Sequence, residues 1–369
     1  MVTIRLKIDA GRNYTEFYFA SNLNGWNPSV GEYKFQKSTE GYELTIALPS
    51  TEIISYKITR GSWETVECTG TGGELPNRII QTNKIKNDTL IVIEVNHWKD
   101  EFANIPKLST KSINVNIISN EFPLTMLGKT RRVWVYLPSN YNKTKKRYPV
   151  LYMHDGQNLF DELTAPFGEW GVDECLDTMC KKLNFDVIVV GIDNGKDERL
   201  SEYSPYDFKV KPDEVNTWDV KGTGDLYLAS LVSDLKPYID SAYRTKSGVK
   251  STHICGSSMG GLISLYAIMR YPEVFGTAGV FSPSFWTNMD SLKAEISRNK
   301  NEKWGGNVYM IAGELEGSRY TSNMTEISEL IERKGKRGIK VSSISMGQHK
   351  ESFWRSMFPD YLRWLSSYN

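Results

Sequence analysis

The sequence predicts an all-β sandwich followed by a second unit with a mainly parallel sheet that helices cover on both faces. Two observations carry this prediction. With 369 residues, the chain exceeds the length at which a single hydrophobic core usually stops growing. The apolar spacing also changes, from alternation with period two in residues 1–99 to short apolar runs separated by helical stretches in residues 113–369. Residues 100–112, which are polar and contain one proline, are the expected linker.

Composition and charge narrow the classes of partner. The chain has 45 Lys and Arg against 44 Asp and Glu, a net charge of +1, so we expect neither nucleic acid nor a membrane surface as a partner. No apolar run approaches the roughly 20 residues needed to span a bilayer. The first eight residues alternate like a strand and lack the apolar core of a signal peptide. We therefore expect a cytoplasmic protein as the sequence is written, and a secreted or periplasmic one if a leader was removed.

The four cysteines do not form a recognisable framework. Their spacing suits neither a disulfide scaffold nor a zinc site, so we expect reduced thiols and no metal or organic cofactor. They are Cys68, Cys175, Cys180 and Cys255.

In the first hundred residues, apolar and polar residues alternate in short segments separated by turn clusters such as residues 22–28 and 69–73. Short strands at this spacing predict an immunoglobulin-like sandwich of about seven strands. No paired acid–base or metal-ligating constellation is present in this region, so we assign it no chemistry.

After residue 113 the pattern is that of alternating strands and helices. Strands are expected at residues 115–117, 131–137, 150–153, 187–192, 252–255, 277–281, 308–312 and 341–344, and helices at 170–183, 225–243, 258–270, 323–334 and 351–366.

Residues 256–260 read Gly-Ser-Ser-Met-Gly and lie between an expected strand and an expected helix. This is G-x-S-x-G in the context of the nucleophile elbow of the α/β-hydrolase fold, in which a tight turn lifts a serine hydroxyl clear of the sheet. Ser258 is therefore the candidate nucleophile. The alternative is a Gly/Ser turn that merely opens a helix.

A serine needs a base, and the chain has four histidines: His97, His154, His253 and His349. In α/β-hydrolases the order along the chain is serine, acid, histidine, and only His349 follows Ser258. His349 is thus the candidate base, the alternative being a loop histidine without a role. We expect His154 to belong to the scaffold and His253 to be buried and hydrogen-bonded beneath the elbow.

The acid should follow the buried strand at residues 308–312. We prefer Glu316 and keep Glu314 as the second candidate; either can also be a solvated loop charge. The oxyanion donors are expected to be the amides of Met259, directly after the nucleophile, and of Gln157 (or Gly156) after the third strand.

Aromatic residues could line an acyl pocket, although a core position is equally compatible with each of them. These residues are Trp170, Trp218, Phe285 and Trp286.

Several segments of the second unit resemble the esterase D superfamily, which includes feruloyl and acetyl-xylan esterases of carbohydrate esterase family one, enterochelin-type esterases and S-formylglutathione hydrolases. The resemblance covers residues 116–369 and implies Ser258 as nucleophile, His349 as base and Glu316 at a position where many members carry Asp. It also implies that Arg199 helps to shape the pocket. The segments that carry it are residues 131–138, 148–160, 170–174, 191–195, 199–205, 256–261 and 347–354.

Residues 19–28, 56–66 and 75–78 resemble the starch- and glycogen-binding sandwich modules of carbohydrate-active enzymes. In such modules exposed aromatic rings stack on sugars, which makes Trp26 and Trp63 the sugar-binding candidates; the alternative is that both pack into the sandwich. Together the two resemblances predict a serine esterase acting on acyl or feruloyl esters of plant-type oligosaccharides or polysaccharides. A siderophore or other small-molecule esterase is the alternative, and a non-catalytic carbohydrate-binding protein is the alternative of another class.

Overall fold

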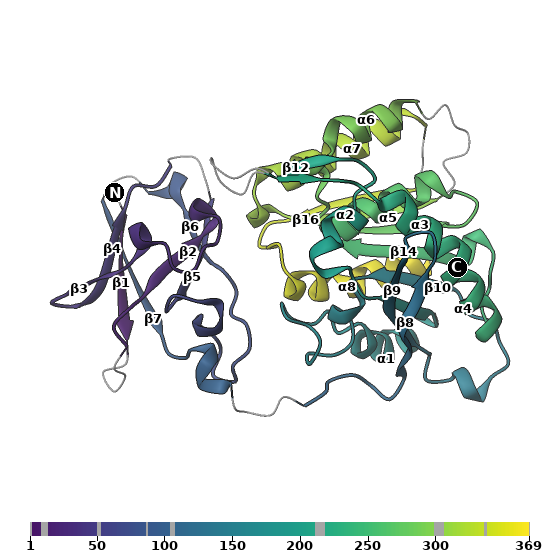
Figure 1. The fold of residues 1–369 in the computed structure, drawn as a ribbon, viewed down its shortest axis with the longest axis horizontal. Coiled ribbons are helices and arrows are strands. Elements are labelled where there is room, and N and C mark those ends of the chain that lie inside the picture. The colour runs from purple at the N-terminus through teal and green to yellow at the C-terminus, as the bar shows by residue number, and fades with distance from the viewer. Residues whose placement is uncertain are drawn as a thin grey trace. The chain divides into compact units, whose positions relative to one another are not determined.

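The computed structural model describes residues 2–8, 14–49, 53–85, 88–103, 108–210, 218–298, 306–335 and 338–368 (Figure 1). The chain divides into two compact units, Met1–Lys107 and Leu108–Asn369. This division falls within the segment 100–112 that the sequence suggests as a linker. Among the described residues, no helix combines the length and the apolar character required to cross a membrane.

The N-terminal unit contains two sheets that share one core. A four-stranded sheet has the order β3 (Gln36–Ser38), β4 (Gly41–Ile46), β1 (Val2–Ile8), β7 (Thr89–Val95), and a three-stranded sheet has the order β2 (Tyr18–Ser21), β5 (Ile53–Thr59), β6 (Arg78–Gln81). Ile4 and Ile93 of the first sheet lie in one buried cluster with Phe19 and Ile58 of the second and with Trp98. The alternating apolar residues of the sequence thus face inward from both sheets.

The second unit is built on an eight-stranded sheet that is parallel except at one edge. The parallel strands β17, β16, β15, β14, β10 and β11 are adjacent in that order, and β9 and β8 follow in antiparallel pairing. All eight expected strands are present. Their bounds are β8 (Val115–Leu124), β9 (Lys129–Tyr136), β10 (Val150–His154), β11 (Ile188–Ile192), β14 (Thr252–Ser257), β15 (Thr277–Phe281), β16 (Asn307–Gly313) and β17 (Ile339–Ile344).

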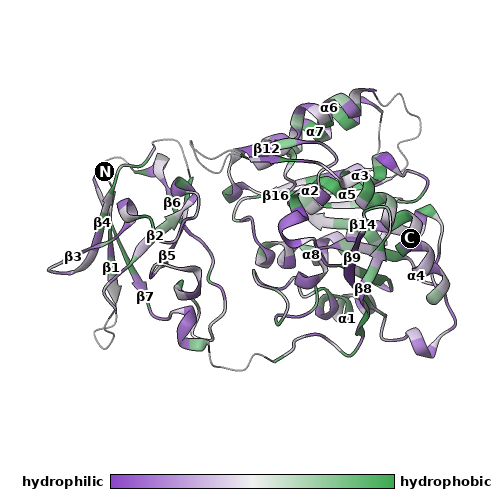
Figure 2. Cartoon of the chain, in the orientation of Figure 1, coloured by the Kyte–Doolittle hydropathy of each residue, from purple (hydrophilic) through white to green (hydrophobic). Residues whose placement is uncertain are grey.

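Helices cover both faces of this sheet (Figure 1). Because side chains alternate along a strand, Val150 and Tyr152 of β10 lie in one core cluster and Leu151 and Met153 in the other. The first cluster includes residues of α3 (Gly224–Ser230), α4 (Lys236–Ala242), α5 (Met259–Arg270), α6 (Met289–Arg298) and α7 (Ser318–Arg333), and the second includes residues of α1 (Val172–Leu183) and α8 (Glu351–Ser366). The hydrophobic colouring of α5 in Figure 2 matches its many side chains in the first cluster.

Two features differ from the expected elements. The single helix expected at residues 225–243 is α3 and α4 joined by a π-helical turn, Leu231–Leu235. Helix α6, the short helix α2 (Arg199–Glu202) and the hairpin of β12 (Phe208–Val210) and β13 (Trp218–Val220) were not expected, since short elements carry too few periodic positions to stand out. Cys68, Cys175 and Cys255 are free thiols, whereas the side chain of Cys180 lies outside the described part of the chain.

Candidate active site

Ser258 stands at the junction of β14 and α5 in a strained backbone conformation. Its φ and ψ are 59° and −120°, a region that residues other than glycine rarely adopt. A Cβ atom at Gly256 would lie 2.8 Å from the backbone of Gly260 and 2.9 Å from the ring of His154. Glycine at position 256 is therefore required for the strand and the helix to approach so closely, and this approach exposes the serine side chain.

The structure brings Ser258, His349 and Glu316 together at the carboxyl end of the sheet. The Ser258 Oγ lies 3.0 Å from His349 Nε2, and His349 Nδ1 lies 2.8 Å from Glu316 Oε2. His349 follows β17, and Glu316 closes a short 3₁₀ turn, Glu314–Glu316, that follows β16. Glu314, the second candidate for the acid, is exposed. Of the two candidates, it is Glu316 that contacts His349.

Glu316 is surrounded by hydrogen-bond donors. Its side chain is fully buried, and its Oε1 accepts from the Gly313 amide at 2.7 Å and from the Ser282 hydroxyl at 2.6 Å. Ser282 in turn accepts from the Trp354 indole N–H at 2.8 Å. These donors stabilise the carboxylate as an anion, so His349 Nδ1 carries a proton toward it and Nε2 is the acceptor for the Ser258 hydroxyl.

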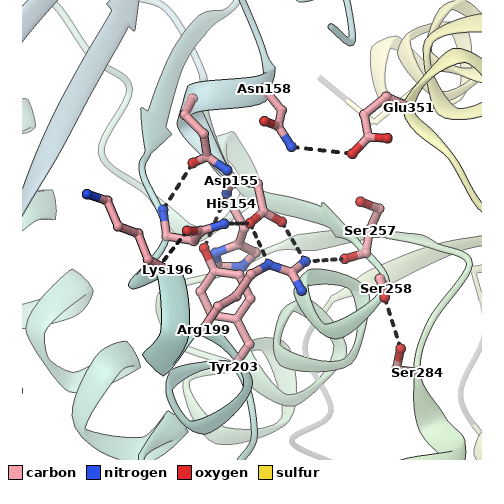
Figure 3. A network of polar contacts seen from close by, with 12 residues as sticks. His154, Asp155, Asn158, Lys196, Arg199, Tyr203, Ser257, Ser258, Ser284 and Glu351 are labelled. Atoms are coloured by element: carbon pink, nitrogen blue, oxygen red, sulfur yellow. Dashed lines mark hydrogen bonds and ion pairs between the residues drawn. The ribbon is translucent and has the colours of Figure 1, made fainter. Parts of the chain in front are cut away.

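Ser284 completes the surroundings of the Ser258 hydroxyl. The two Oγ atoms are 3.0 Å apart, and the Ser284 amide donates to the Ser258 carbonyl at 3.1 Å (Figure 3). Because the Ser258 proton points to His349, the Ser284 hydroxyl is the donor to Ser258. Neither Ser282 nor Ser284 was expected at the site from sequence patterns. They directly follow the strand expected at residues 277–281, and the rule that functional residues follow the carboxyl ends of parallel strands would have found them.

The imidazole of His349 is packed on two sides and open on a third. The ring centroid lies 4.7 Å from that of Tyr320 and 5.2 Å from that of Trp354. The side chain still has 30% of its surface exposed, so the imidazole is not closed off from solvent.

The two candidate oxyanion donors lie at the starts of short helical segments. Met259 is the first residue of α5, where an amide has no intrahelical acceptor. Gln157 lies in a 3₁₀ turn, Gly156–Asn158, directly after β10. Its side chain accepts from the Asn194 amide at 3.1 Å, and its carbonyl accepts from Thr164 Oγ1 at 2.7 Å. These bonds tie the Gln157 loop to its neighbours.

Arg199 lies beneath the nucleophile and contacts protein groups. It donates to both oxygens of Asp155, at 2.7 and 2.8 Å, and to the Ser257 carbonyl at 3.5 Å (Figure 3). Burial acts to raise the pKa of Asp155, but the charge and hydrogen bonds of Arg199 outweigh it and set that pKa below its ordinary value. The pocket role expected for Arg199 is therefore an indirect one, since its guanidinium links the Gln157 loop to the elbow.

The two histidines that precede Ser258 in the second unit are buried structural residues, as expected. His154 Nδ1 lies 2.8 Å from the Tyr227 hydroxyl, and burial lowers the pKa of His154 from 6.5 to about 3. His253 is fully buried, and its Nδ1 lies 2.9 Å from Thr277 Oγ1.

Some of the aromatic side chains expected to line the acyl pocket are buried in the core. Trp170 is 2% exposed and packs against Phe281 and Trp354, so the expectation that it binds substrate is wrong for this structure. Phe285 is fully buried in the core. Trp218 of β13 is exposed.

Trp286 is partly buried and offers an edge of the site. The Arg319 guanidinium lies 4.6 Å from its ring centroid and 5.6 Å from that of Tyr320, which packs on His349. Trp286 is thus connected to His349 through two side chains, those of Arg319 and Tyr320.

In the N-terminal unit, Trp26 and Trp63 are neighbours. Their ring centroids are 6.5 Å apart with 39° between the planes; Trp63 is exposed and Trp26 is partly buried. Neither ring belongs to the buried core of that unit.

The α/β-hydrolase-like fold and the serine, histidine and glutamate that meet in it define a serine hydrolase. A sequence profile of the Esterase family, described as "Putative esterase", matches residues 125–365. The chain belongs to this family and is a carboxylic ester hydrolase.

Several characterised proteins are similar. The ferri-bacillibactin esterase BesA of Bacillus subtilis is 28% identical over 211 residues, 53% of this chain and 70% of that protein. An endo-1,4-beta-xylanase/feruloyl esterase of Xylanibacter ruminicola is 29% identical over 161 residues, 42% of this chain and 20% of that protein. The enterobactin esterase FES of Shigella flexneri, crystallised with enterobactin, superposes with a TM-score of 0.59 at 16% identity and covers 98% of this chain and 91% of its own.

Proposed function

We propose that Ser258 is the nucleophile of the esterase, His349 its general base and Glu316 the acid that orients His349. His349 Nε2 removes the proton from the Ser258 hydroxyl as its oxygen attacks the ester carbonyl. The resulting imidazolium is stabilised by Glu316 and then protonates the leaving alcohol. Water, deprotonated by the same imidazole, attacks the acyl-enzyme and releases the acid.

Negative charge develops on the carbonyl oxygen during the attack. We assign its stabilisation to hydrogen bonds from the backbone amides of Met259 and Gln157. Preorganised amide donors typically contribute several kcal/mol of barrier reduction, because they need no reorientation during the reaction. Ser284 is a positioning residue, whose hydroxyl fixes the Ser258 oxygen before attack.

The observation that carries this assignment is the unbroken chain of contacts from Glu316 through His349 to Ser258, with distances of 2.8 and 3.0 Å. It also speaks against the view that the hydrolase unit is an inactive carrier of a carbohydrate-binding module. The test is hydrolysis of a short-chain p-nitrophenyl ester. Ser258→Ala should lower kcat on the order of 10⁴-fold or more at unchanged thermal stability, and an active Ser258→Ala protein would refute the assignment.

For the substrate, we infer acyl or feruloyl esters of plant-type oligosaccharides or polysaccharides, with the N-terminal unit acting as an immunoglobulin-like carbohydrate-binding module. Two observations support this inference. Trp26 and Trp63 form an adjacent pair outside the core, which suits stacking against a sugar ring. The relative from Xylanibacter ruminicola is named for both xylanase and feruloyl esterase activity.

A siderophore ester is the second candidate substrate, and Arg319 is the observation that favours it. A guanidinium 4.6 Å from the Trp286 ring, one side chain away from His349, suits an anionic aromatic acyl group. Two of the similar proteins are named as ferri-bacillibactin and enterobactin esterases.

An activity panel separates these substrates: acetyl-xylan, methyl ferulate and a trilactone siderophore, each compared by kcat/KM. Arg319→Gln should lower kcat/KM for the siderophore alone. A pull-down on insoluble xylan and starch tests the module, where Trp26→Ala and Trp63→Ala should each reduce the bound fraction. Retention by both variants would refute sugar binding through these rings.

A further inference from the structure

Three carboxylates gather at the start of helix α1, outside the site built around Ser258. Glu169 lies three residues before the helix, and Asp173 and Glu174 lie in its first turn. One ligand oxygen of each residue lies within 4.8 Å of those of the other two. Glu169 and Asp173 are 4% and 0% exposed, and Glu174 is partly buried. Three carboxyl groups thus share one small, largely buried volume.

Each carboxylate also has an oxygen without a hydrogen-bond partner. Within the described part of the chain, these buried, unpaired atoms are Glu169 Oε1, Asp173 Oδ1 and Glu174 Oε2. The second oxygens of two of them are occupied, since Glu169 Oε2 accepts from Thr110 Oγ1 at 3.1 Å and Asp173 Oδ2 accepts from the Ser112 amide at 2.6 Å. One oxygen anchors each of these two groups, and the other is left for a ligand.

Neither the helix nor a neighbouring cation accounts for the cluster. A helix dipole favours carboxylates in the first turn, but Glu169 precedes the helix and its Oε1 receives no helical amide. The nearest guanidinium is that of Arg355, whose Nη1 lies 3.8 Å from Glu169 Oε2, the oxygen that Thr110 already contacts. The Arg355 side chain is 45% exposed, so solvent screens most of its charge.

We propose that Glu169, Asp173 and Glu174 bind a calcium ion. An all-oxygen set of carboxylates selects a hard divalent cation over zinc, which prefers nitrogen and sulfur. A set of three protein carboxylates suits calcium, which takes six to eight oxygen ligands, whereas magnesium usually keeps several waters and is bound through one or two carboxylates. Water and backbone carbonyls would supply the remaining positions of a six- to eight-coordinate ion.

The position of the cluster defines what the ion would do. Thr110 and Ser112 belong to the segment that enters the hydrolase unit, and both donate to the cluster. The Trp170 amide donates to the Asn158 carbonyl at 2.8 Å, and the Val172 amide to the Leu159 carbonyl at 3.0 Å. A cation bound by residues 169–174 would therefore fix the entering segment, the start of α1 and the loop that carries Gln157. The site is structural, and it positions the oxyanion loop without touching substrate.

The test uses the full chain after treatment with a chelator, with calcium chloride as the titrant and magnesium chloride as the comparison. Calorimetry should give one calcium ion per chain. The Tm should rise by about 3 °C or more when calcium exceeds its Kd a hundredfold, and magnesium should have a smaller effect. Terbium luminescence sensitised by Trp170, next to Glu169 in the sequence, reports on the site itself.

Glu169→Gln is the decisive variant, with Glu329→Gln on the exposed face of α7 as its matched control. In chelator, Glu169→Gln should be folded and at least as stable as the parent, because it removes one of three carboxyl groups crowded in a buried volume. With calcium, its Tm should not respond, while the control should behave as the parent. Two outcomes would overturn the proposal. The first is that the parent shows no saturable calcium binding, which is expected if the carboxylates share a proton instead of an ion. The second is that Glu169→Gln binds calcium and terbium as the parent does.

Discussion

Two glutamates of the hydrolase unit have equally buried side chains but differ in the hydrogen-bond partners that the protein gives their carboxylate oxygens. The side chain of Glu316 is 0% exposed, and both its oxygens have partners: Ser282, the Gly313 amide and His349. The side chain of Glu169 is 1% exposed, and its Oε1 has no partner among the described residues. Burial alone therefore does not define the state of a carboxylate.

The difference lies in the donors around each group. Donors that are fixed before the reaction replace the water around Glu316, so it remains an anion and can stabilise a charged imidazole. Around Glu169 the neighbours are other carboxylates, so the same charge is unfavourable until a cation or a proton arrives. The first arrangement is suited to catalysis and the second to binding an ion. Substitutions around the two glutamates test this comparison.

Replacing the acid at the site with its neutral isostere should produce the largest change. Glu316→Gln keeps the shape but leaves His349 without an anion and in the wrong tautomer, so kcat on a p-nitrophenyl ester should fall on the order of 10⁴-fold. Glu314→Gln, two residues away and exposed, should change kcat less than about twofold. A large loss in Glu314→Gln with little in Glu316→Gln would reverse the assignment of the acid.

His154 extends the comparison to a buried base. Burial lowers its pKa to about 3, below the 6.5 of an unfolded chain, so the unfolded state binds the proton first as pH falls. Stability should therefore be lost progressively from about pH 6.5 down to pH 3, by on the order of 4 kcal/mol in total. Chemical denaturation at several pH values measures it. His154→Gln should flatten the slope in this range, and an unchanged slope would contradict the neutral state of the ring.

Removing one hydrogen-bond donor from Glu316 should make its surroundings more like those of Glu169, a buried carboxylate with fewer donors. Ser282→Ala leaves one donor on Glu316 Oε1 and leaves the Trp354 indole N–H unpaired. Each lost partner of a buried polar group costs about 1–3 kcal/mol, so the free energy of unfolding should decrease by that order. Ser366→Ala, a partly buried position at the last residue of α8, is the control and should leave stability within about 0.5 kcal/mol. Equal stability of the two variants would show that Ser282 does not support Glu316.

The smallest effect is expected for Arg355. If a bound ion, rather than this guanidinium, balances the acidic cluster, Arg355→Gln should change the free energy of unfolding by less than about 1 kcal/mol in calcium. Guanidinium chloride denaturation measures this change. A loss of several kcal/mol would identify Arg355 as the counter-charge of Glu169 and weaken the comparison drawn above.

Local patterns were sufficient for much of the fold and for two residues of the site. Strand periodicity located all eight strands of the large sheet, because alternation and apolar runs are local consequences of a pleated backbone. The elbow at Ser258 was visible because its glycines serve a local turn. His349 followed from counting, since no other histidine comes after the serine.

What the sequence left open depends on contacts between distant segments. Glu314 and Glu316 are equivalent in sequence, and only the packing of β16 beside β15 and β17 buries one of them between Ser282 and His349. Trp170 and Arg199 were expected at the pocket. Trp170 instead packs in the core and Arg199 pairs with Asp155, because strand order decides which side chains meet. The same packing left Glu169 Oε1 and Asp173 Oδ1 without a hydrogen-bond donor among the described residues. The local sequence determines the conformations that a segment prefers. The burial of a side chain and its hydrogen-bond partners depend on how the whole sheet is assembled.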